Sequence, residues 1–251
     1  MTPRRAALVT GAARRIGRDI ALHLAASGWD IGLHYANSKD EAEATAREIG
    51  AAGAACRLYA ADLADAGAAA PLVDRFVGDF ARAQLLVNSA AIFERDTLED
   101  FGPDLWRRHM DLNTLAPLLL SKRFHEKTPG KGCIVNILDQ KVGSLTPDYF
   151  SYTLSKCALA DATRMMAMAM APKTRVNAVA PGLVLVSGDL SQQQYERLHV
   201  RTPLGVGPEP AEIAGAVAWF AGTPSVTGQI LTIDGGRHMM RDRPHDDLPK
   251  D

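Results

Sequence analysis

Short runs of apolar residues alternate along the chain with longer segments of helical periodicity, and this alternation restricts the fold more than any other feature. The apolar runs predict seven strands, at residues 6–10, 31–35, 55–60, 85–88, 133–138, 175–179 and 230–233. The segments between them predict helices at residues 15–27, 39–51, 72–80, 106–124, 149–170 and 210–221. Strands that are apolar throughout and separated by helices are typical of a parallel sheet covered on both faces. Right-handed crossovers then predict an α/β fold, a doubly wound Rossmann domain with a seven-stranded parallel sheet.

We predict one domain over residues 1–251. No internal repeat and no linker rich in Pro, Gly and Ser divides the chain. Residues 237–251 are charged and contain proline, which predicts a tail whose end is disordered. Residues 183–200 follow the sixth strand and are expected to form a lid that contacts substrate from Leu183 onward, with residues 192–194 on a solvated helix face.

The composition excludes several classes of partner. The formal net charge is -1, so no overall field attracts nucleic acid or anionic lipid. The three cysteines are far apart and odd in number, which argues against a disulfide framework and suits a reducing compartment. The histidines share no metal-ligand spacing, and no apolar stretch approaches the roughly 20 residues of a membrane-spanning helix. We therefore expect a cytoplasmic protein that binds no metal, nucleic acid or membrane.

A glycine-containing turn joins the first predicted strand to the first predicted helix. Gly11 permits a tight turn, and Gly17 permits close approach of the backbone. Free N–H groups and the positive end of the helix dipole favour a phosphate at this position. Arg14, Arg15 and Ile16 lie in the same turn, where two guanidinium groups suit phosphate oxygens. The turn predicts a dinucleotide site, and a purely structural turn is the alternative.

Side chains after the second and third strands bear on the type of dinucleotide. Many dinucleotide sites carry an acid at the end of the second strand, where it binds a ribose diol. Here no acid occurs before Asp40, and the stretch reads His34, Tyr35, Ala36, Asn37 and Ser38. Uncharged polar groups near arginines suit a 2′-phosphate, so NADPH is favoured over NADH; ordinary loop polarity is the alternative. Asp62 and Leu63 are placed to meet the adenine, although Asp62 is equally suited to cap the next helix.

Tyr152 and Lys156 form the candidate proton-transfer pair. They are four residues apart in a helical segment and so share one face. A neighbouring ammonium favours the phenolate and brings the tyrosine pKa down from about 10. Asp139 ends the preceding strand, where ligands bind in open α/β sheets. Asn113 is a polar residue in the preceding apolar helix, and an ordinary surface pair or buried contact is the alternative for these groups.

These residues resemble the short-chain dehydrogenase/reductase family over roughly residues 5–236. The landmarks are the turn at residues 10–17, Asp62-Leu63, Asn88-Ser89-Ala90, Asn113, Tyr152 with Lys156, Pro181-Gly182 and Asp234-Gly235-Gly236. The resemblance implies that Tyr152 is the general acid, that Lys156 lowers its pKa and holds the nicotinamide ribose, and that Asn113 supports a relay water. It also implies cofactor contacts at Asn88, Ala90, Pro181 and Gly182, and a homotetramer.

Two departures from the family pattern resemble its pteridine reductase and dihydromonapterin reductase branch. Arg15 stands where the family has Gly or Ala, and Asp139 replaces the usual catalytic serine. The resemblance implies that Phe93 stacks on a pterin, that Arg15 bridges the cofactor pyrophosphate and the pterin carbonyl, and that Asp139 accepts hydrogen bonds from the pterin ring. It also suggests that Arg241 reaches a neighbouring subunit's site.

The sequence therefore predicts an NADPH-dependent oxidoreductase that reduces a dihydropterin to the tetrahydro form, with Tyr152 as proton donor. A ketone or 3-oxoacyl reductase of the same family is the first alternative. A non-catalytic sensor that binds NADP is the second alternative, and the presence of Asn113, Tyr152 and Lys156 argues against it.

Overall fold

A computed structural model describes residues 4–188 and 190–240 of the chain. The predicted disorder at the end of the tail and the predicted role of Arg241 lie outside the described residues.

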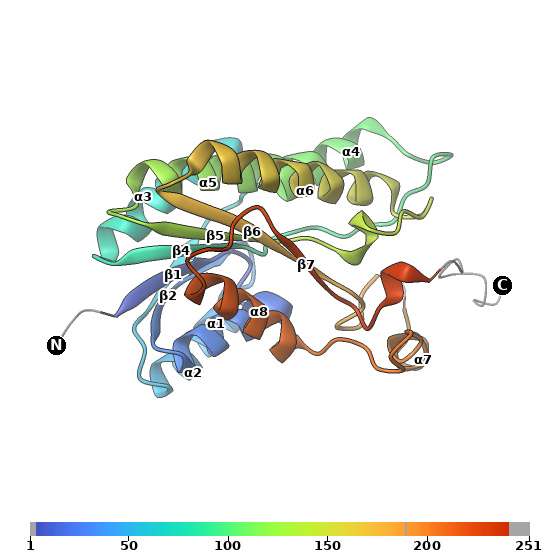
Figure 1. The fold of residues 1–251 in the computed structure, drawn as a ribbon, viewed down its shortest axis with the longest axis horizontal. Coiled ribbons are helices and arrows are strands. Elements are labelled where there is room, and N and C mark those ends of the chain that lie inside the picture. Colours follow the sequence, from blue (N-terminus) through green and yellow to red (C-terminus); the bar gives the residue numbers. More distant parts are fainter. Residues whose placement is uncertain (1–3, 189, 241–251) are drawn as a thin grey trace.

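A parallel seven-stranded sheet forms the centre of the described chain (Figure 1). Its order is β3-β2-β1-β4-β5-β6-β7, and every neighbouring pair is parallel. The strands are β1 (Arg5–Val9), β2 (Trp29–Tyr35), β3 (Cys56–Ala60), β4 (Ala83–Asn88), β5 (Gly132–Ile137), β6 (Thr174–Pro181) and β7 (Ile230–Ile233). The doubly wound Rossmann fold predicted from the apolar runs is confirmed.

Helices cover both faces of the sheet. In Figure 1, α1 (Arg15–Ala26), α2 (Lys39–Ala51) and α8 (Pro210–Gly222) lie below it, and α3 (Ala69–Asp79), α5 (Ala116–Lys127) and α6 (Phe150–Met170) lie above. Successive β1 residues alternate between the two resulting cores: Ala7 and Val9 pack into one, Ala6 and Leu8 into the other. This alternation is the reason that the strands read as apolar throughout.

The predicted helix 106–124 is interrupted. It begins earlier, as α4 (Pro103–Met110), and passes through a π-helical turn, η2 (Asp111–Leu115), before α5. Within this turn Asn113 and Thr114 are buried and hydrogen bond to groups outside their own helix. The extra residue of the π turn changes the direction of these two side chains, so that they reach α6 and the loop at Ile92. A regular helix predicted from its apolar residues would not show this.

The remaining elements are short and lie on connections. They are α7 (Gln192–His199) and three 3-10 turns, η1 (Ala66–Ala68), η3 (Gln140–Val142) and η4 (Arg237–Met239). Ser191 and Gln194 form a capping box at the start of α7. The segment predicted as a lid therefore contains a helix, and residues 192–193 are exposed on it, as expected.

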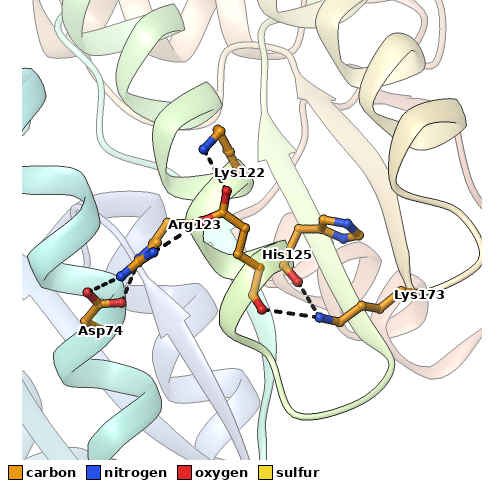
Figure 2. A network of polar contacts seen from close by, with 6 residues as sticks. Asp74, Lys122, Arg123, His125 and Lys173 are labelled. Carbon is orange, nitrogen blue, oxygen red and sulfur yellow. Dashed lines mark hydrogen bonds and ion pairs between the residues drawn. The ribbon is translucent and has the colours of Figure 1, made fainter.

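Charged side chains join helices near the amino end of β6 (Figure 2). Arg123 of α5 forms two hydrogen bonds, of 2.8 and 2.6 Å, with Asp74 of α3. Lys173, just before β6, donates to the carbonyl of His125 over 2.6 Å. Exposed ion pairs of this kind contribute little to stability, because solvent screens the charges. The network fastens the end of the sheet that lies opposite the carboxyl ends of the strands.

Thr10 joins the carboxyl ends of β1 and β4, the two central strands. It is buried, and its Oγ1 accepts hydrogen bonds from the backbone N–H groups of Ser89 at 2.9 Å and Ala90 at 3.0 Å. The same hydroxyl donates to the carbonyl of Val87 over 3.3 Å. One side chain therefore holds the first turn of the fold beside the loop that leaves β4.

We predict that Thr10→Val lowers the free energy of unfolding by about 1–3 kcal/mol, because two N–H groups lose their acceptor while the side-chain volume is kept. Thr10→Ser retains the hydroxyl and is the matched control. Urea denaturation of the three proteins measures the difference. Equal unfolding midpoints for the Val and Ser variants would contradict this account.

Candidate active site

The carboxyl ends of the strands open into a cavity of about 1100 Å³. Its walls come from the first turn, the ends of β2, β4, β5 and β6, the start of α6, and residues of the segments 181–187 and 190–198. Every site residue predicted from the sequence lines this cavity except Asn88 and Asn113, which lie beneath its floor. Segments far apart in the sequence thus converge where an open α/β sheet offers a crevice for a ligand.

The first turn has the shape required for a phosphate. Gly11 has a φ of +64°, and a Cβ at this position would lie 2.9 Å from the Cα of Ala90. A Cβ on Gly17 would lie 2.3 Å from the carbonyl oxygen of Gly11. Both positions therefore require glycine. The first turn of α1 carries no acidic residue and no side-chain cap, so its N–H groups are open to an anion.

His34 holds the first turn in place through hydrogen bonds at both ring nitrogens. The backbone N–H of Gly11 donates to its Nδ1 over 3.2 Å, so the ring proton lies on Nε2, which donates to the carbonyl of Ala61 over 3.0 Å. Burial lowers the pKa of His34 to about 4, which keeps the ring neutral. Both ring nitrogens bind the protein itself. His34 lines the cavity, and its hydrogen bonds tie the turn to β2 and to the end of β3.

The rim after β2 and β3 remains open to a ligand. Tyr35 and Ser38 are half-buried, and Asn37 is exposed. Asp62 is exposed, and its carboxylate accepts a local hydrogen bond from Ala64 N–H at 3.0 Å. The alternative role of Asp62 as a helix cap is wrong, because Asp65 caps the following turn. Leu63 is buried beside Asp62.

Asn88 lies in a buried row of polar side chains. Its Nδ2 donates to Oδ1 of Asn136 over 2.8 Å and to Ser121 over 3.3 Å, and Asn136 donates to Thr163 over 2.9 Å. Sequence reasoning missed Asn136, Ser121 and Thr163. The available signal was that Asn88 and Asn136 are polar residues in otherwise apolar strands, and they are partners in the register of β4 and β5.

Asn113 supports the loop that follows β4. Its Oδ1 accepts from Ile92 N–H at 3.0 Å, and its Nδ2 donates to the Ile92 carbonyl at 3.0 Å and to Ser155 at 3.1 Å. Asn113 is fully buried, so it acts on the site through the loop and α6.

Tyr152, Asp139 and Lys156 meet in the cavity wall. The phenol of Tyr152 donates to Oδ2 of Asp139 over 3.1 Å. Lys156 Nζ donates to the carbonyl of Ile137 over 2.9 Å and lies 5.8 Å from the centre of the Tyr152 ring. The predicted grouping of the three side chains is therefore present.

The electrostatics of the phenol differ from the sequence-based expectation. Burial, followed by the Asp139 carboxylate, raises the pKa of Tyr152 above its usual value. Burial also raises the pKa of Asp139 and lowers that of Lys156 to about 8. The expectation that Lys156 lowers the phenol pKa is therefore wrong for this structure, because burial and then the contacting carboxylate raise that pKa. A phenol that stays protonated suits the donation of a proton.

Phe93 forms an aromatic corner with two tyrosines. Its ring stacks on Tyr149 with centroids 4.1 Å apart and planes 7° apart. It meets the Tyr152 ring edge-on, at 4.6 Å and 81°. Sequence reasoning found Phe93 but missed Tyr149, which precedes α6 with a φ of +53°. An aromatic residue with positive φ is uncommon, and that was not visible in the sequence.

The segment after β6 closes the outer side of the cavity. The carboxyl end of β6 brings Pro181 and Gly182 to the wall, and Leu183 follows. Arg15 donates from its guanidinium to the carbonyl of Val186 over 2.9 Å, across 171 residues of sequence. Tyr195 of α7 donates to the carbonyl of Val184 over 2.8 Å. Arg15 therefore links the phosphate-ready turn to the expected lid.

Among residues 4–188 and 190–240, no group of three or more His, Cys, Asp or Glu side chains is arranged to hold a metal ion. No helix in that part of the chain combines the length and apolar character needed to cross a bilayer.

A glycine turn fitted to a phosphate and a Tyr–Lys pair at the same edge of a doubly wound sheet define a dinucleotide-dependent oxidoreductase. A family model described as enoyl-(acyl carrier protein) reductase matches residues 11–238. The chain belongs to the short-chain dehydrogenase/reductase family.

Curated relatives span nearly the whole chain. An uncharacterised oxidoreductase of Methylorubrum extorquens is 34% identical over 238 residues, covering 92% of this chain and 96% of the relative. The 3-oxoacyl-[acyl-carrier-protein] reductase FabG of Staphylococcus aureus is 32% identical over 250 residues, covering 94% of this chain and 98% of the relative.

Two solved structures are also similar. FolM alternative dihydrofolate reductase 1 from Brucella canis, complexed with NADP, is 38% identical with a TM-score of 0.92 and covers 99% of both chains. The Brucella suis protein of the same name, also in complex with NADP, is 39% identical with a TM-score of 0.92 and covers 97% of this chain and 99% of its own.

We predict that kcat/KM for reduction falls as the pH rises above about 8. This parameter reports ionisations of the free enzyme, and Lys156 loses its charge through a pKa of about 8. The activity that depends on the ammonium is therefore present below that pH and lost above it. Lys156→Arg keeps the charge and is expected to move the alkaline limb to higher pH, whatever its effect on the maximum rate. An identical alkaline limb in both proteins would show that another group titrates there.

Proposed function

We propose that this protein is an NADPH-dependent reductase that converts a dihydropterin to a tetrahydropterin. The observation that carries the proposal is the direct hydrogen bond between Asp139 and Tyr152 beside the ring of Phe93. A flat heterocycle with ring N–H and amino donors matches a carboxylate acceptor and an aromatic face. The similarity to the two FolM structures supports the same class of substrate.

The first turn fits the dinucleotide. Gly11, Arg14, Arg15 and Ile16 would hold the phosphates, and the uncharged rim at Tyr35, Asn37 and Ser38 leaves room for a 2′-phosphate. The remaining predicted cofactor contacts come from Asp62, Leu63, Ala90, Pro181 and Gly182 in the cavity wall, with His34 and Asn88 supporting them from within. When bound, NADPH supplies the hydride. Both FolM structures were solved with NADP.

The chain's own residues supply the proton. Tyr152 holds it on the phenol oxygen, because burial and Asp139 both oppose ionisation. Reduction of a C=N bond requires a proton at nitrogen, and Tyr152 is placed to deliver it directly or through water. Asp139, whose pKa is raised by burial, accepts the hydrogen bond of the phenol through Oδ2 and that of the Lys141 backbone N–H through Oδ1, so it orients the proton donor. Lys156 places a positive charge behind the phenol ring and at the cavity wall.

A ketone or 3-oxoacyl reductase is the second candidate. The 32% identity to FabG over nearly the whole chain favours it. Asp139 favours the pterin reading, since a carboxylate accepts hydrogen bonds from ring N–H groups. A serine at this position would instead donate to a carbonyl oxygen.

We also propose a cytoplasmic homotetramer. The outer face of α6 exposes Leu154, Met165 and Met168, and the two methionines are 65% and 75% exposed in the single chain. Large apolar side chains on an outer helix face suit a contact between subunits. Three dispersed cysteines without a disulfide suit a reducing compartment.

We predict that Asp139→Ser lowers kcat/KM for dihydropterins by about tenfold or more, because the carboxylate that accepts from ring N–H groups and orients the phenol is lost. Activity toward simple ketones is expected to stay constant or rise. NADPH consumption with dihydromonapterin, dihydrobiopterin, dihydrofolate and a ketone panel measures both effects. Tyr152→Phe is the control that abolishes turnover of every substrate. A wild-type enzyme that reduces ketones and leaves dihydropterins untouched would support the second candidate instead.

We predict that Ala36→Asp raises KM for NADPH by about tenfold or more, the equivalent of roughly 1.4 kcal/mol of repulsion from the 2′-phosphate. Ala36 is exposed at the rim after β2, so the substitution leaves the core unchanged. Ala36→Asn, of similar size and uncharged, is the matched control and is expected to keep the preference for NADPH. Parallel changes in KM for NADPH and NADH would place the 2′-phosphate elsewhere.

A further inference from the structure

The loop between β4 and α4 carries Phe93 into the cavity and is anchored on both sides of that residue. Asn113 accepts from the backbone N–H of Ile92 and donates to its carbonyl, each over 3.0 Å. The backbone N–H of Glu94 donates to Nε2 of His109 over 3.3 Å. His109 and Asn113 are four residues apart, about one helical turn, and they hold loop residues on either side of Phe93.

Asp96 anchors the same loop to the start of the catalytic helix. Its backbone carbonyl accepts from Phe150 N–H at 3.1 Å. Its carboxylate accepts from the backbone N–H of Ser151 at 3.1 Å and from the Ser151 hydroxyl. Tyr149, the cap residue of α6, provides no side-chain cap, so a carboxylate 55 residues earlier in the chain caps this helix. The positive end of the α6 dipole favours that negative charge.

His109 completes a one-way chain of hydrogen bonds. Because a backbone N–H can only donate, Nε2 of His109 is an acceptor, and the ring proton must lie on Nδ1. Nδ1 lies 2.8 Å from Oγ of Ser151 and donates to it. The Ser151 hydroxyl then donates to Asp96. Burial lowers the pKa of His109, in keeping with a neutral ring. The chain runs from Glu94 N–H through His109 and Ser151 to the Asp96 carboxylate.

This network lies directly behind the substrate-facing rings. His109 and Ser151 are fully buried, and Asp96 is 2% exposed. The ring of His109 packs edge-on against Tyr152 with centroids 6.0 Å apart, and Ser151 precedes Tyr152 in α6. On the cavity side, the rings of Tyr152 and Phe93 are in contact, with centroids 4.6 Å apart. None of the three polar residues lines the cavity, so they act on the site through Phe93 and Tyr152.

We propose that Asp96, Ser151 and His109 are positioning residues that fix the ring of Phe93 relative to the phenol of Tyr152. A substrate held on the Phe93 ring is thereby presented to the proton donor at a set distance. The inference rests on the proposed function in one respect, namely that Phe93 contacts the substrate.

A double-mutant cycle tests the coupling. His109→Phe keeps a ring against Tyr152 and removes both hydrogen bonds, and we expect kcat/KM for a dihydropterin to fall about 10- to 100-fold, the cost of a small misplacement. In a Phe93→Ala background the same substitution is expected to have little further effect, because the ring that it misplaces is gone. His109→Gln, which restores an acceptor and a donor, is expected to recover part of the rate. NADPH affinity is expected to stay constant in all variants. Equal losses from His109→Phe in both backgrounds would overturn the inference.

Hydrogen exchange tests the anchoring without any substrate. Ser151→Ala is expected to speed amide exchange in a peptide covering residues 92–97. The matched control is Thr114→Val, which removes a buried hydroxyl bond of 2.9 Å between η2 and the carbonyl of Ser155 but leaves the loop attachments intact. Exchange in residues 92–97 that stays at the wild-type rate in Ser151→Ala would overturn the inference. If the wild type turns over ketones and not dihydropterins, the proposed function fails; the cycle is then run with the ketone, and the exchange result stands by itself.

Discussion

The close approach of Gly11 to Ala90 is the constraint on which the rest of the site depends. These residues leave β1 and β4, the neighbouring central strands from which the chain connections run in opposite directions. A single added carbon on Gly11 would lie 2.9 Å from the Cα of Ala90. Thr10 binds the loop after β4, and His34 holds the first turn against β2 and the end of β3. Only then are the N–H groups of α1 directed into the cavity, and only then does the loop after β4 start in the right place to carry Phe93.

Burial determines how the proton is held. Asp139 and Tyr152 share one hydrogen bond in the buried wall of the cavity. Burial raises the pKa of both groups; Asp139 raises the pKa of Tyr152 further, whereas the hydrogen bond from Tyr152 favours the ionised form of Asp139. Lys156 stays close to the ring while its ammonium donates to the carbonyl of Ile137. Asp139, Tyr152 and the aromatic corner at Phe93 therefore form one unit. The hydrogen bond between Asp139 and Tyr152 affects both the charge that faces a ligand and the proton on the phenol. We propose that the network of Asp96, Ser151 and His109 holds Phe93 and Tyr152 in position relative to each other.

Much of the site was predictable, but not how its parts are joined. The apolar runs located all seven strands. The Gly11–Gly17 turn, Tyr152, Lys156 and Asp139 were singled out from spacing, from their place between the predicted elements and from the family resemblance, and all of them line one cavity. The π turn at Asp111–Leu115 was missed because its cause is a set of hydrogen bonds to α6 and to the loop after β4. Tyr149 was missed because a positive φ leaves no mark on a sequence. Asn88 was assigned to the cofactor, and its side-chain amide binds Asn136 on the next strand; the cofactor contact of Asn88 stays a prediction.

The sequence by itself determined the fold class, the order of the elements, the phosphate-ready turn and the pairing of Tyr152 with Lys156. Each of these depends on hydrophobic periodicity or on residue spacing within a short segment, and both can be read directly from the sequence. Only the tertiary structure decided that the pKa of Tyr152 is raised, that His34 is neutral and bound on both sides, and that His109, Ser151 and Asp96 meet behind Phe93. Those outcomes depend on the burial of side chains and on contacts between segments far apart in the sequence. Both arise only when the folded sheet brings the segments together.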